Sequence, residues 1–250
     1  MSTTIFAANW KMHHGPDDAR GFMERFLGRY AAAPDREVWF FPAAVSLSAV
    51  AAMAERRSDI KVGAQNVHWE PKGAFTGELS VTMAKQAGAA AALVGHSERR
   101  HVFGETDEET ANKVRALLAA DVVPMLCVGE TLDERNAVAT ERVVQRQLSA
   151  LNGLNPGELE KILIAYEPVW AIGTGKNATP DDAANVHASI RSWLAERGVA
   201  EDRARILYGG SVKPANAAAL LAESEIDGVL VGGASLDPDS WLDVVRTGLD

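Results

Sequence analysis

In this 250-residue chain, the sequence around Glu167 is the one that best suits a side chain acting as a base. It comes after the apolar run from Lys161 to Ala165, which is typical of a buried parallel strand. A carboxylate at the end of such a strand can lie deep in the core only at a steep cost of ionisation. Pro168 bars a smooth passage into helix and holds Glu167 extended. We therefore interpret Glu167 as a candidate general base.

The segment after Glu167 has the composition of a lid. Trp170 and Ile172 are apolar, and Gly173 and Gly175 lie on either side of Thr174. Apolar residues on a glycine-bordered loop beside a strand-end carboxylate favour a segment that closes over substrate and excludes water. The alternative is a tight turn that carries a surface glutamate.

Three further polar residues follow apolar runs. Asn9 and Lys11 come after the first run, and His96 comes after the fourth. A short helix is predicted from Ser97 to Arg100, and its N–H groups would favour a neutral imidazole that can donate to a substrate oxygen. Lys11 could stabilise a developing oxyanion or a phosphate. The alternatives are a hydrogen-bonded structural histidine and a solvated lysine.

Two glycine-rich segments follow the last two apolar runs. Gly209-Gly210-Ser211 and Gly232-Gly233 predict a phosphate cradle, because glycine lets backbone N–H groups approach an oxyanion closely. Gly173 could add a third donor when the lid closes. The alternative for each pair alone is a permissive turn.

Eight apolar runs are positioned to carry these residues. Their ranges are 5–8, 38–41, 60–64, 89–94, 122–128, 161–165, 205–208 and 228–231. Helical segments separate them, at about 30 residues per unit, which is typical of a parallel α/β architecture. Eight units without a linker predict one domain, residues 1–250, folded as a (β/α)8 barrel. Active sites of such barrels lie at the carboxyl ends of the strands, where all of the candidate residues occur.

The helical segments have recognisable starts. Thr106-Asp107-Glu108-Glu109 is a capping box, and proline followed by acidic residues opens the helices at 16, 180 and 238. After the fifth run, Val144, Leu148 and Leu151 share helical spacing and predict one long helix.

Composition narrows the class of protein. A net charge of −9 argues against nonspecific nucleic-acid binding. No apolar run approaches the roughly 20 residues of a membrane span, and the start of the chain does not resemble a signal peptide. The single cysteine, Cys127, allows no intrachain disulfide and fits a reducing compartment. We expect a cytoplasmic protein that binds neither nucleic acid nor membrane.

No cofactor is indicated. The histidines have no metal-ligand spacing, and no GxGxxG follows a strand. Cys127 is interpreted as a packing residue. Arg99 and Arg100 are expected to be exposed or ion-paired and to order the loop near His96.

Motifs along the whole chain resemble the triosephosphate isomerase family. They are Ala8-Asn9-Trp10-Lys11-Met12, Gly73-Ala74-Phe75-Thr76-Gly77-Glu78, Val94-Gly95-His96-Ser97-Glu98-Arg99-Arg100, Leu126-Cys127-Val128-Gly129-Glu130, the segment from Tyr166 to Lys176, Tyr208-Gly209-Gly210-Ser211-Val212 and Val231-Gly232-Gly233-Ala234-Ser235-Leu236.

The resemblance implies interconversion of glyceraldehyde 3-phosphate and dihydroxyacetone phosphate without a cofactor. It implies that Glu167 shuttles the proton, that neutral His96 polarises the carbonyl, and that Lys11 and Asn9 stabilise the oxyanion. It also implies that Gly173, Ser211, Gly232 and Gly233 hold the phosphate. Rival interpretations are a metal-dependent epimerase, a Schiff-base aldolase, and a catalytically silent barrel that binds a phosphate ligand or acts as an interaction protein.

The resemblance further implies a homodimer through the loop at 65–77. Trp69 and Phe75 are aromatic residues of this loop, and Thr76 is expected at its tip beside the partner's active site. A long loop with exposed aromatic residues on a compact domain needs a partner or a function. His13-His14 and Trp69 depart from the pattern of the family.

Overall fold

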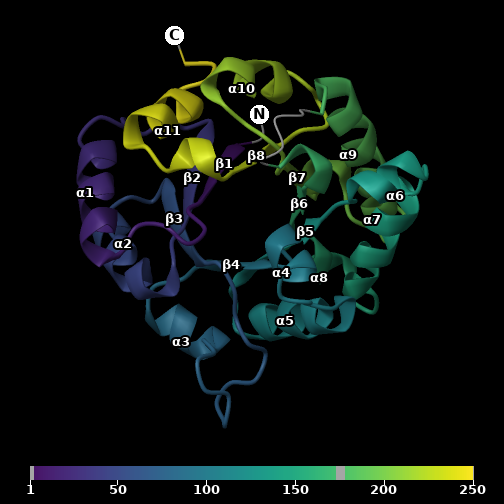
Figure 1. Ribbon diagram of the computed structural model, residues 1–250, viewed down its shortest axis with the longest axis horizontal. Coiled ribbons are helices and arrows are strands. Elements are labelled where there is room, and N and C mark those ends of the chain that lie inside the picture. The colour runs from purple at the N-terminus through teal and green to yellow at the C-terminus, as the bar shows by residue number, and fades with distance from the viewer. Residues whose placement is uncertain (1–2, 173–177, 250) are drawn as a thin grey trace.

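Eight parallel strands close into a barrel in which each strand pairs with the next along the chain and the last pairs with the first. The computed structural model describes residues 3–172 and 178–249. The strands are β1 (Thr4–Asn9), β2 (Arg36–Phe41), β3 (Ile60–Ala64), β4 (Ala91–Val94), β5 (Val123–Val128), β6 (Leu163–Tyr166), β7 (Arg205–Tyr208) and β8 (Gly228–Val231). The predicted (β/α)8 barrel is confirmed, and Figure 1 looks along it.

Both faces of the strands are buried, as the continuous apolar runs predict. One alternate set of side chains fills the inside of the barrel: Ile5, Ala7, Trp39, Phe41, Ala91, Leu93, Met125, Cys127, Leu163, Ala165, Leu207 and Leu230. The other set packs against the surrounding helices, and Phe6, Val38 and Phe40 belong to it. Cys127 is fully buried in the inner set, which confirms its interpretation as a packing residue.

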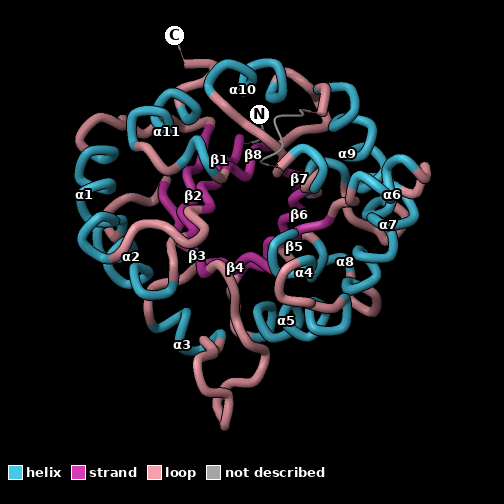
Figure 2. The backbone as a smooth tube through the Cα atoms, in the orientation of Figure 1, coloured by secondary structure: helices cyan, strands magenta, loops and turns pink. Residues whose placement is uncertain are grey.

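Helices surround the barrel (Figure 2). In the described residues they are α1 (Pro16–Leu27), α2 (Leu47–Ala54), α3 (Val81–Gln86), α4 (Ser97–His101), α5 (Asp107–Ala119), α6 (Leu132–Asn136), α7 (Thr140–Leu148), α8 (Pro156–Leu159), α9 (Pro180–Ala195), α10 (Pro214–Leu221) and α11 (Pro238–Val245). Short 3-10 turns join them: η1 (Ala44–Ser46), η2 (Ser149–Leu151), η3 (Val169–Ala171), η4 (Glu201–Arg203) and η5 (Gly233–Ser235). None of the helices described is both long and apolar enough to cross a membrane.

The predicted capping chemistry is present. Thr106 accepts from the N–H of Glu109, whose carboxylate accepts from the N–H of Thr106, so the capping box at α5 is confirmed. Thr179 and Asp237 cap α9 and α11 in front of a proline at the first helical position. These bonds satisfy N–H groups that a helix start leaves unpaired.

The prediction of a single long helix after the fifth strand is wrong. The segment is divided into α6, α7, η2 and α8. Val138 ends the first piece in a left-handed conformation with φ of 54°, and Pro156 starts a new helix after Asn155. Val144 and Leu148 still share the buried face of α7, so periodicity located the core face but not the breaks.

The loop at 65–77 extends away from the barrel between β3 and α3 (Figure 2). His68 stacks on Trp69 with a centroid distance of 4.2 Å and contacts Phe75 at 4.3 Å. These ring contacts hold the three side chains together within the projecting loop.

Candidate active site

The carboxyl ends of the strands surround a cavity of about 600 Å³, a size typical of sites for small ligands. Residues predicted from sequence lie together around it: Asn9, Lys11, His96, Glu167, Ser211, Gly232 and Gly233 all line the cavity. Gly173, the remaining predicted residue, lies outside the described residues. Parallel strands bring these side chains together because all of their carboxyl ends face one rim of the barrel.

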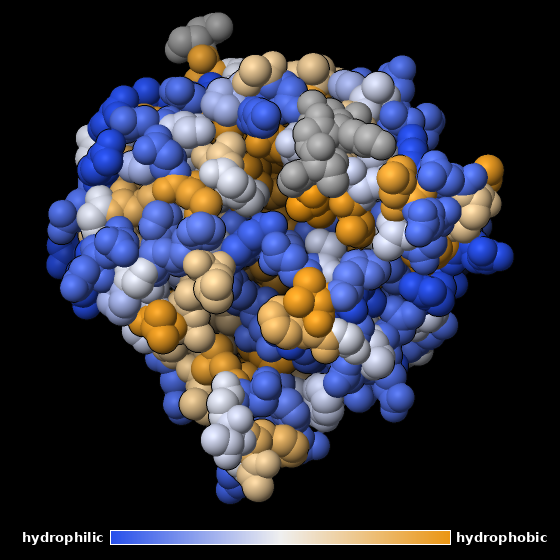
Figure 3. All heavy atoms as spheres, in the orientation of Figure 1, coloured by the Kyte–Doolittle hydropathy of each residue, from blue (hydrophilic) through white to orange (hydrophobic). Residues whose placement is uncertain are grey.

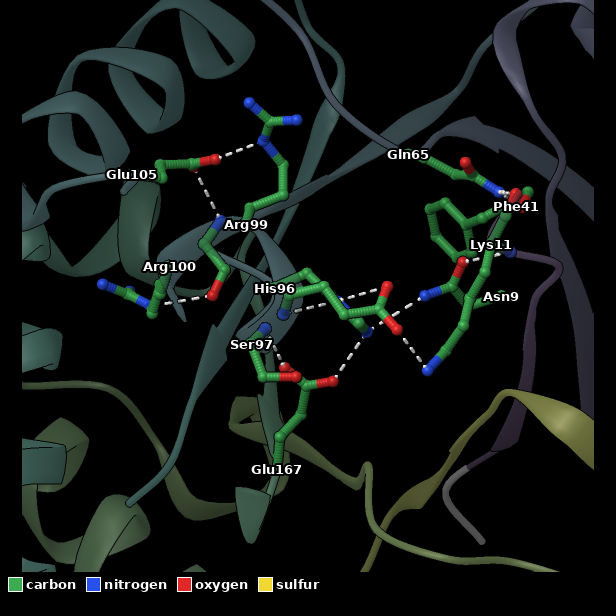
Figure 4. Close-up of polar contacts among 12 residues, drawn as sticks. Asn9, Lys11, Phe41, Gln65, His96, Ser97, Arg99, Arg100, Glu105 and Glu167 are labelled. Carbon is green, nitrogen blue, oxygen red and sulfur yellow. Dashed lines mark hydrogen bonds and ion pairs between the residues drawn. The ribbon is translucent and has the colours of Figure 1, made fainter. Parts of the chain in front are cut away.

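Glu167 is held at the floor of the cavity directly after β6. Its backbone N–H donates to Val128 O at 2.7 Å, which continues the β5–β6 pairing, and its side chain is almost fully buried. Oε2 accepts the N–H of Ser97 at 2.8 Å, and Oε1 lies 2.9 Å from His96 Nε2 (Figure 4). A Cβ at residue 209 would lie 2.8 Å from Glu167 Cγ, so Gly209 leaves room for the carboxylate to lie there.

His96 is the N-cap residue of α4, as the sequence predicts. Its Nδ1 accepts the N–H of Glu98 at 3.3 Å, a bond that requires Nδ1 to be unprotonated. Nε2 lies 3.1 Å from Asn9 Nδ2 and faces Glu167. The ring is therefore held so that Nε2 points into the cavity (Figure 4).

The two partners change each other's pKa. Burial by itself would raise the pKa of Glu167 and lower that of His96, because it disfavours charge. The imidazole, the Ser97 N–H and the Lys11 charge instead hold the pKa of Glu167 below its usual value. The carboxylates of Glu167 and Glu98 likewise hold the pKa of His96 above its usual value.

Lys11 is oriented by three contacts. Its Nζ pairs with Glu98 at 2.7 Å, its N–H donates to Asn9 Oδ1 at 3.0 Å, and its carbonyl accepts from Gln65 Nε2 at 2.7 Å. Its φ of 50° is unusual for a residue with a side chain, and such a conformation costs on the order of 1–3 kcal/mol. The surrounding contacts offset this strain and aim the ammonium group at the cavity.

Sequence reasoning assigned no role to several residues that contact the predicted ones. Ser97, Glu98 and Gln65 each bond directly to a predicted site residue. Ser97 and Glu98 belong to the motif around His96, so their adjacency was a usable signal. Gln65 had none, because its contact with Lys11 spans 54 positions of the chain.

The phosphate cradle predicted from the glycines lies across the cavity from α4. Gly232 and Gly233 begin η5, and Ser235 closes this turn by donating to Gly232 O at 2.7 Å. A Cβ at residue 232 would lie 3.1 Å from Lys11 Cε, so this glycine allows the lysine stem to pass. Ser211 adds a hydroxyl after β7.

The described part of the predicted lid begins beside the cavity. Ile172 lines it, and Trp170 Nε1 donates to Glu130 Oε1 at 2.8 Å. Glu130 also accepts from the Tyr166 hydroxyl, and the Arg135 guanidinium lies 4.4 Å from the Trp170 ring centroid. The start of the segment is thus anchored, and the predicted lid movement stays a prediction.

The two arginines after His96 are ion-paired, as expected. Arg99 pairs with Glu105 at 2.6 Å (Figure 4). Arg100 pairs with Asp107 at 2.6 Å. Arg100 also donates to Gly95 O at 2.7 Å. These bonds order the loop that carries the imidazole. In the described ranges no three His, Cys, Asp or Glu side chains gather as metal ligands would.

A barrel that places a buried carboxylate–imidazole pair beside a glycine turn in one cavity belongs to the class of acid–base barrel enzymes. Comparison with known proteins is consistent with this class of enzyme and identifies one family within it. The family model described as "Triosephosphate isomerase" matches residues 4–248. The chain belongs to the triosephosphate isomerase family, so the resemblance inferred from its motifs is confirmed.

Curated relatives carry the same name. The chain is 49% identical to the triosephosphate isomerase of Symbiobacterium thermophilum over 244 residues, which cover 96% of this chain and 95% of the relative. It is 47% identical to that of Roseiflexus sp. over 249 residues, covering 98% of each. For Aquifex aeolicus the identity is 45% over 243 residues, covering 96% and 98%.

Proposed function

We propose that this protein interconverts D-glyceraldehyde 3-phosphate and dihydroxyacetone phosphate, as a triose-phosphate isomerase of glycolysis and gluconeogenesis. Family membership along the matched residues 4–248 supports the reaction. The observation that carries the mechanism is the contact of 2.9 Å between Glu167 Oε1 and His96 Nε2 at the floor of the cavity. Triosephosphate isomerases are themselves a standard example of a glutamate base paired with a neutral histidine, so this agreement is expected of a family member.

The reaction needs a proton to move between two neighbouring carbons. Glu167 takes the proton from the carbon next to the carbonyl, and the electron pair passes to the carbonyl oxygen to give an enediolate. His96 donates through Nε2 to that oxygen, and Lys11 with Asn9 stabilises the charge. His96 gives its Nε2 proton to the former carbonyl oxygen and takes up the proton of the neighbouring hydroxyl, whose oxygen becomes the new carbonyl. Glu167 returns its proton to the adjacent carbon, the former carbonyl carbon. One carbon is oxidised as the other is reduced, so the balance requires no external oxidant or reductant.

Substrate binding changes the electrostatics of His96. The carbonyl oxygen takes the place of Glu167 at Nε2, which removes the charge that most raises the pKa of the imidazole. Burial and the N–H of Glu98 on Nδ1 then favour the neutral ring. We propose that the contact between Glu167 and His96 Nε2 gives way, when substrate binds, to a hydrogen bond from neutral His96 to the carbonyl oxygen.

The phosphate group is assigned to Ser211, Gly232 and Gly233, with Gly173 as a further donor from the lid. Backbone N–H groups at the start of η5 and the Lys11 charge support this assignment, because both favour an anion at the same side of the cavity. Closure of the segment with Trp170 and Ile172 would exclude water from the enediolate.

A homodimer through the loop at 65–77 is also proposed. Beside the main cavity lies a hollow of about 220 Å³, and Lys11, Gln65, Glu98 and Phe103 are among the residues that line it. Met12 is 95% exposed, and Val102 and Phe103 are also exposed. Figure 3 shows apolar side chains gathered between the barrel mouth and the projecting loop. Such a surface supports a partner whose loop tip enters the hollow next to Lys11.

Two broader proposals come from the sequence. Residues 1–250 are proposed to form one domain, and the β1–β8 pairing supports this because it joins the two ends of the chain in one sheet. The cytoplasmic location stays a prediction.

The function is tested by a coupled assay of the purified protein with glyceraldehyde 3-phosphate, run with and without EDTA. Fast formation of dihydroxyacetone phosphate that is insensitive to the chelator is expected. Folded but inactive protein would favour a silent phosphate-binding barrel, and loss of activity with EDTA would favour a metal-dependent enzyme.

A further inference from the structure

The segment that leaves β1 contains a second residue in the left-handed region, His14, with φ of 61°. Histidine tolerates this conformation better than most residues with a side chain. Its ring packs edge-on against buried Trp10 with a centroid distance of 4.9 Å and lies 5.6 Å from the ring of Phe22 in α1. The ring is therefore held in place.

The polar edge of this ring reaches the opposite end of the sequence. His14 Nε2 lies 3.1 Å from Leu236 O, 222 positions away. A carbonyl oxygen only accepts, so Nε2 must carry the proton and donate. Leu236 is the C-cap residue of η5, the turn that Gly233 begins, and it lines the same cavity. Figure 1 shows the helices that follow these two segments, α1 and α11, as neighbours around the ring.

The backbone of the same segment is held from the other side. Ser46 is fully buried in η1, and its hydroxyl donates to His14 O at 2.7 Å. Gln65 donates to Lys11 O at 2.7 Å. The segment from Lys11 to His14 is thus joined to the loops after β2 and β3 through its carbonyls, and to η5 through the imidazole of His14.

We propose that His14 is a positioning residue, which holds η5 and its phosphate-binding glycines in register with Lys11. Lys11 and the N–H groups of η5 come from opposite ends of the chain and must face one phosphate. The His14–Leu236 hydrogen bond links the two backbones that carry them. The inference rests on the proposed function only in taking a phosphate as the ligand of η5.

The test compares two substitutions that differ in reach. His14→Asn tolerates the left-handed conformation, but its amide nitrogen matches Nδ1 and falls short of Leu236 O. His14→Gln places its amide nitrogen about where Nε2 lies, and can restore the bond. We expect His14→Asn to raise the dissociation constant of inorganic phosphate, measured by calorimetry, by about three- to tenfold, the range for loss of one neutral hydrogen bond. KM should rise by a similar factor with kcat within about twofold, and His14→Gln should recover most of the loss.

Phe22→Leu is the matched control. It trims the ring that packs on His14 and Trp10 but leaves the Leu236 hydrogen bond in place. It should lower the melting temperature and leave the dissociation constant of inorganic phosphate within about twofold of the wild-type value. Equal weakening of phosphate binding in Phe22→Leu and His14→Asn, or unchanged binding in His14→Asn, would overturn the proposal.

A measurement on the unmodified protein guards against variants that fail to fold. Nitrogen NMR of the imidazole should show His14 with its proton on Nε2, and a signal that shifts when phosphate saturates the site. A proton on Nδ1 would overturn the proposal. Calorimetry and NMR need no turnover. An inactive wild-type protein would therefore count against the proposed isomerase activity and not against the role of His14.

Discussion

Glu167 Oε1 lies 2.9 Å from His96 Nε2, so the proposed base and the proposed electrophile contact each other across the cavity floor. Both side chains are more than nine-tenths buried. The carboxylate is also fixed by the Ser97 N–H at 2.8 Å. A base held this closely has little freedom to compensate for a change in its length.

Glu167→Asp is expected to reduce kcat by orders of magnitude with a modest change in KM. Withdrawing the carboxylate by one methylene moves it away from the carbon that it must deprotonate, and misplacement by about 1 Å can cost about a hundredfold in rate. Steady-state kinetics of the isomerisation measure the effect. Glu196→Asp, at an exposed carboxylate, is the matched control. Near-normal turnover of Glu167→Asp would remove this residue as the base.

His187 is expected to make the protein less stable at mildly acidic pH. It is fully buried in α9 and donates through Nδ1 to Glu225 O at 3.0 Å, and burial lowers its pKa to about 4. Because the unfolded chain binds this proton at about pH 6.5 and the folded chain only near pH 4, stability falls as the pH drops through that window. Between pH 7.5 and pH 5 the loss through this group should be about 2 kcal/mol.

Urea unfolding of wild type and His187→Phe at these two pH values measures the contribution of His187. The phenyl ring keeps an aromatic neighbour for Tyr166, and Glu225 O still accepts from Arg191 at 3.2 Å. The free energy of unfolding should fall less between pH 7.5 and pH 5 for the variant than for wild type, whatever its value at pH 7.5. An equal loss in both proteins would show that His187 does not cause the effect.

Glu105→Gln is expected to lower the free energy of unfolding by about 3–5 kcal/mol, because it breaks a buried charge pair in the loop that carries His96. Glu105 is buried and pairs with Arg99 at 2.6 Å and with Lys113 at 3.2 Å, and it accepts the Gly95 N–H at 3.0 Å. The substitution leaves the ammonium of Lys113 buried beside a neutral amide. Denaturant unfolding measures the change, with Glu108→Gln as the exposed control in the same region, expected within about 0.5 kcal/mol of wild type.

Thr76→Glu is expected to shift the proposed dimer towards a poorly active monomer. Thr76 is exposed on the projecting loop, and its docking into the hollow beside the partner's Lys11 would bring the new carboxylate next to Glu98. Burying an unpaired carboxylate there is costly. Sedimentation velocity at low protein concentration, together with activity, tests the shift. Unchanged sedimentation would exclude this loop from the interface.

Much of the fold was predictable because it depends on patterns that a sequence displays directly. Apolar runs at regular intervals, each closed by glycine, proline or a polar residue, specify buried strands of one direction. Since parallel strands share an orientation, residues at their carboxyl ends must lie on one rim, so the sequence alone predicts that Asn9, His96 and Glu167 lie together. The break at Val138 escaped prediction, because a left-handed residue without glycine leaves no compositional signal.

Only the tertiary structure decided how the site residues contact one another. The pairs Glu167–His96, Lys11–Gln65 and His14–Leu236 join residues 71, 54 and 222 positions apart. Nothing local to either partner encodes such a contact, because it depends on side-chain rotamers and on how closely neighbouring loops pack once the barrel closes. Local pattern therefore determined which residues reach the rim. Barrel closure, through long-range packing, determined which of them meet.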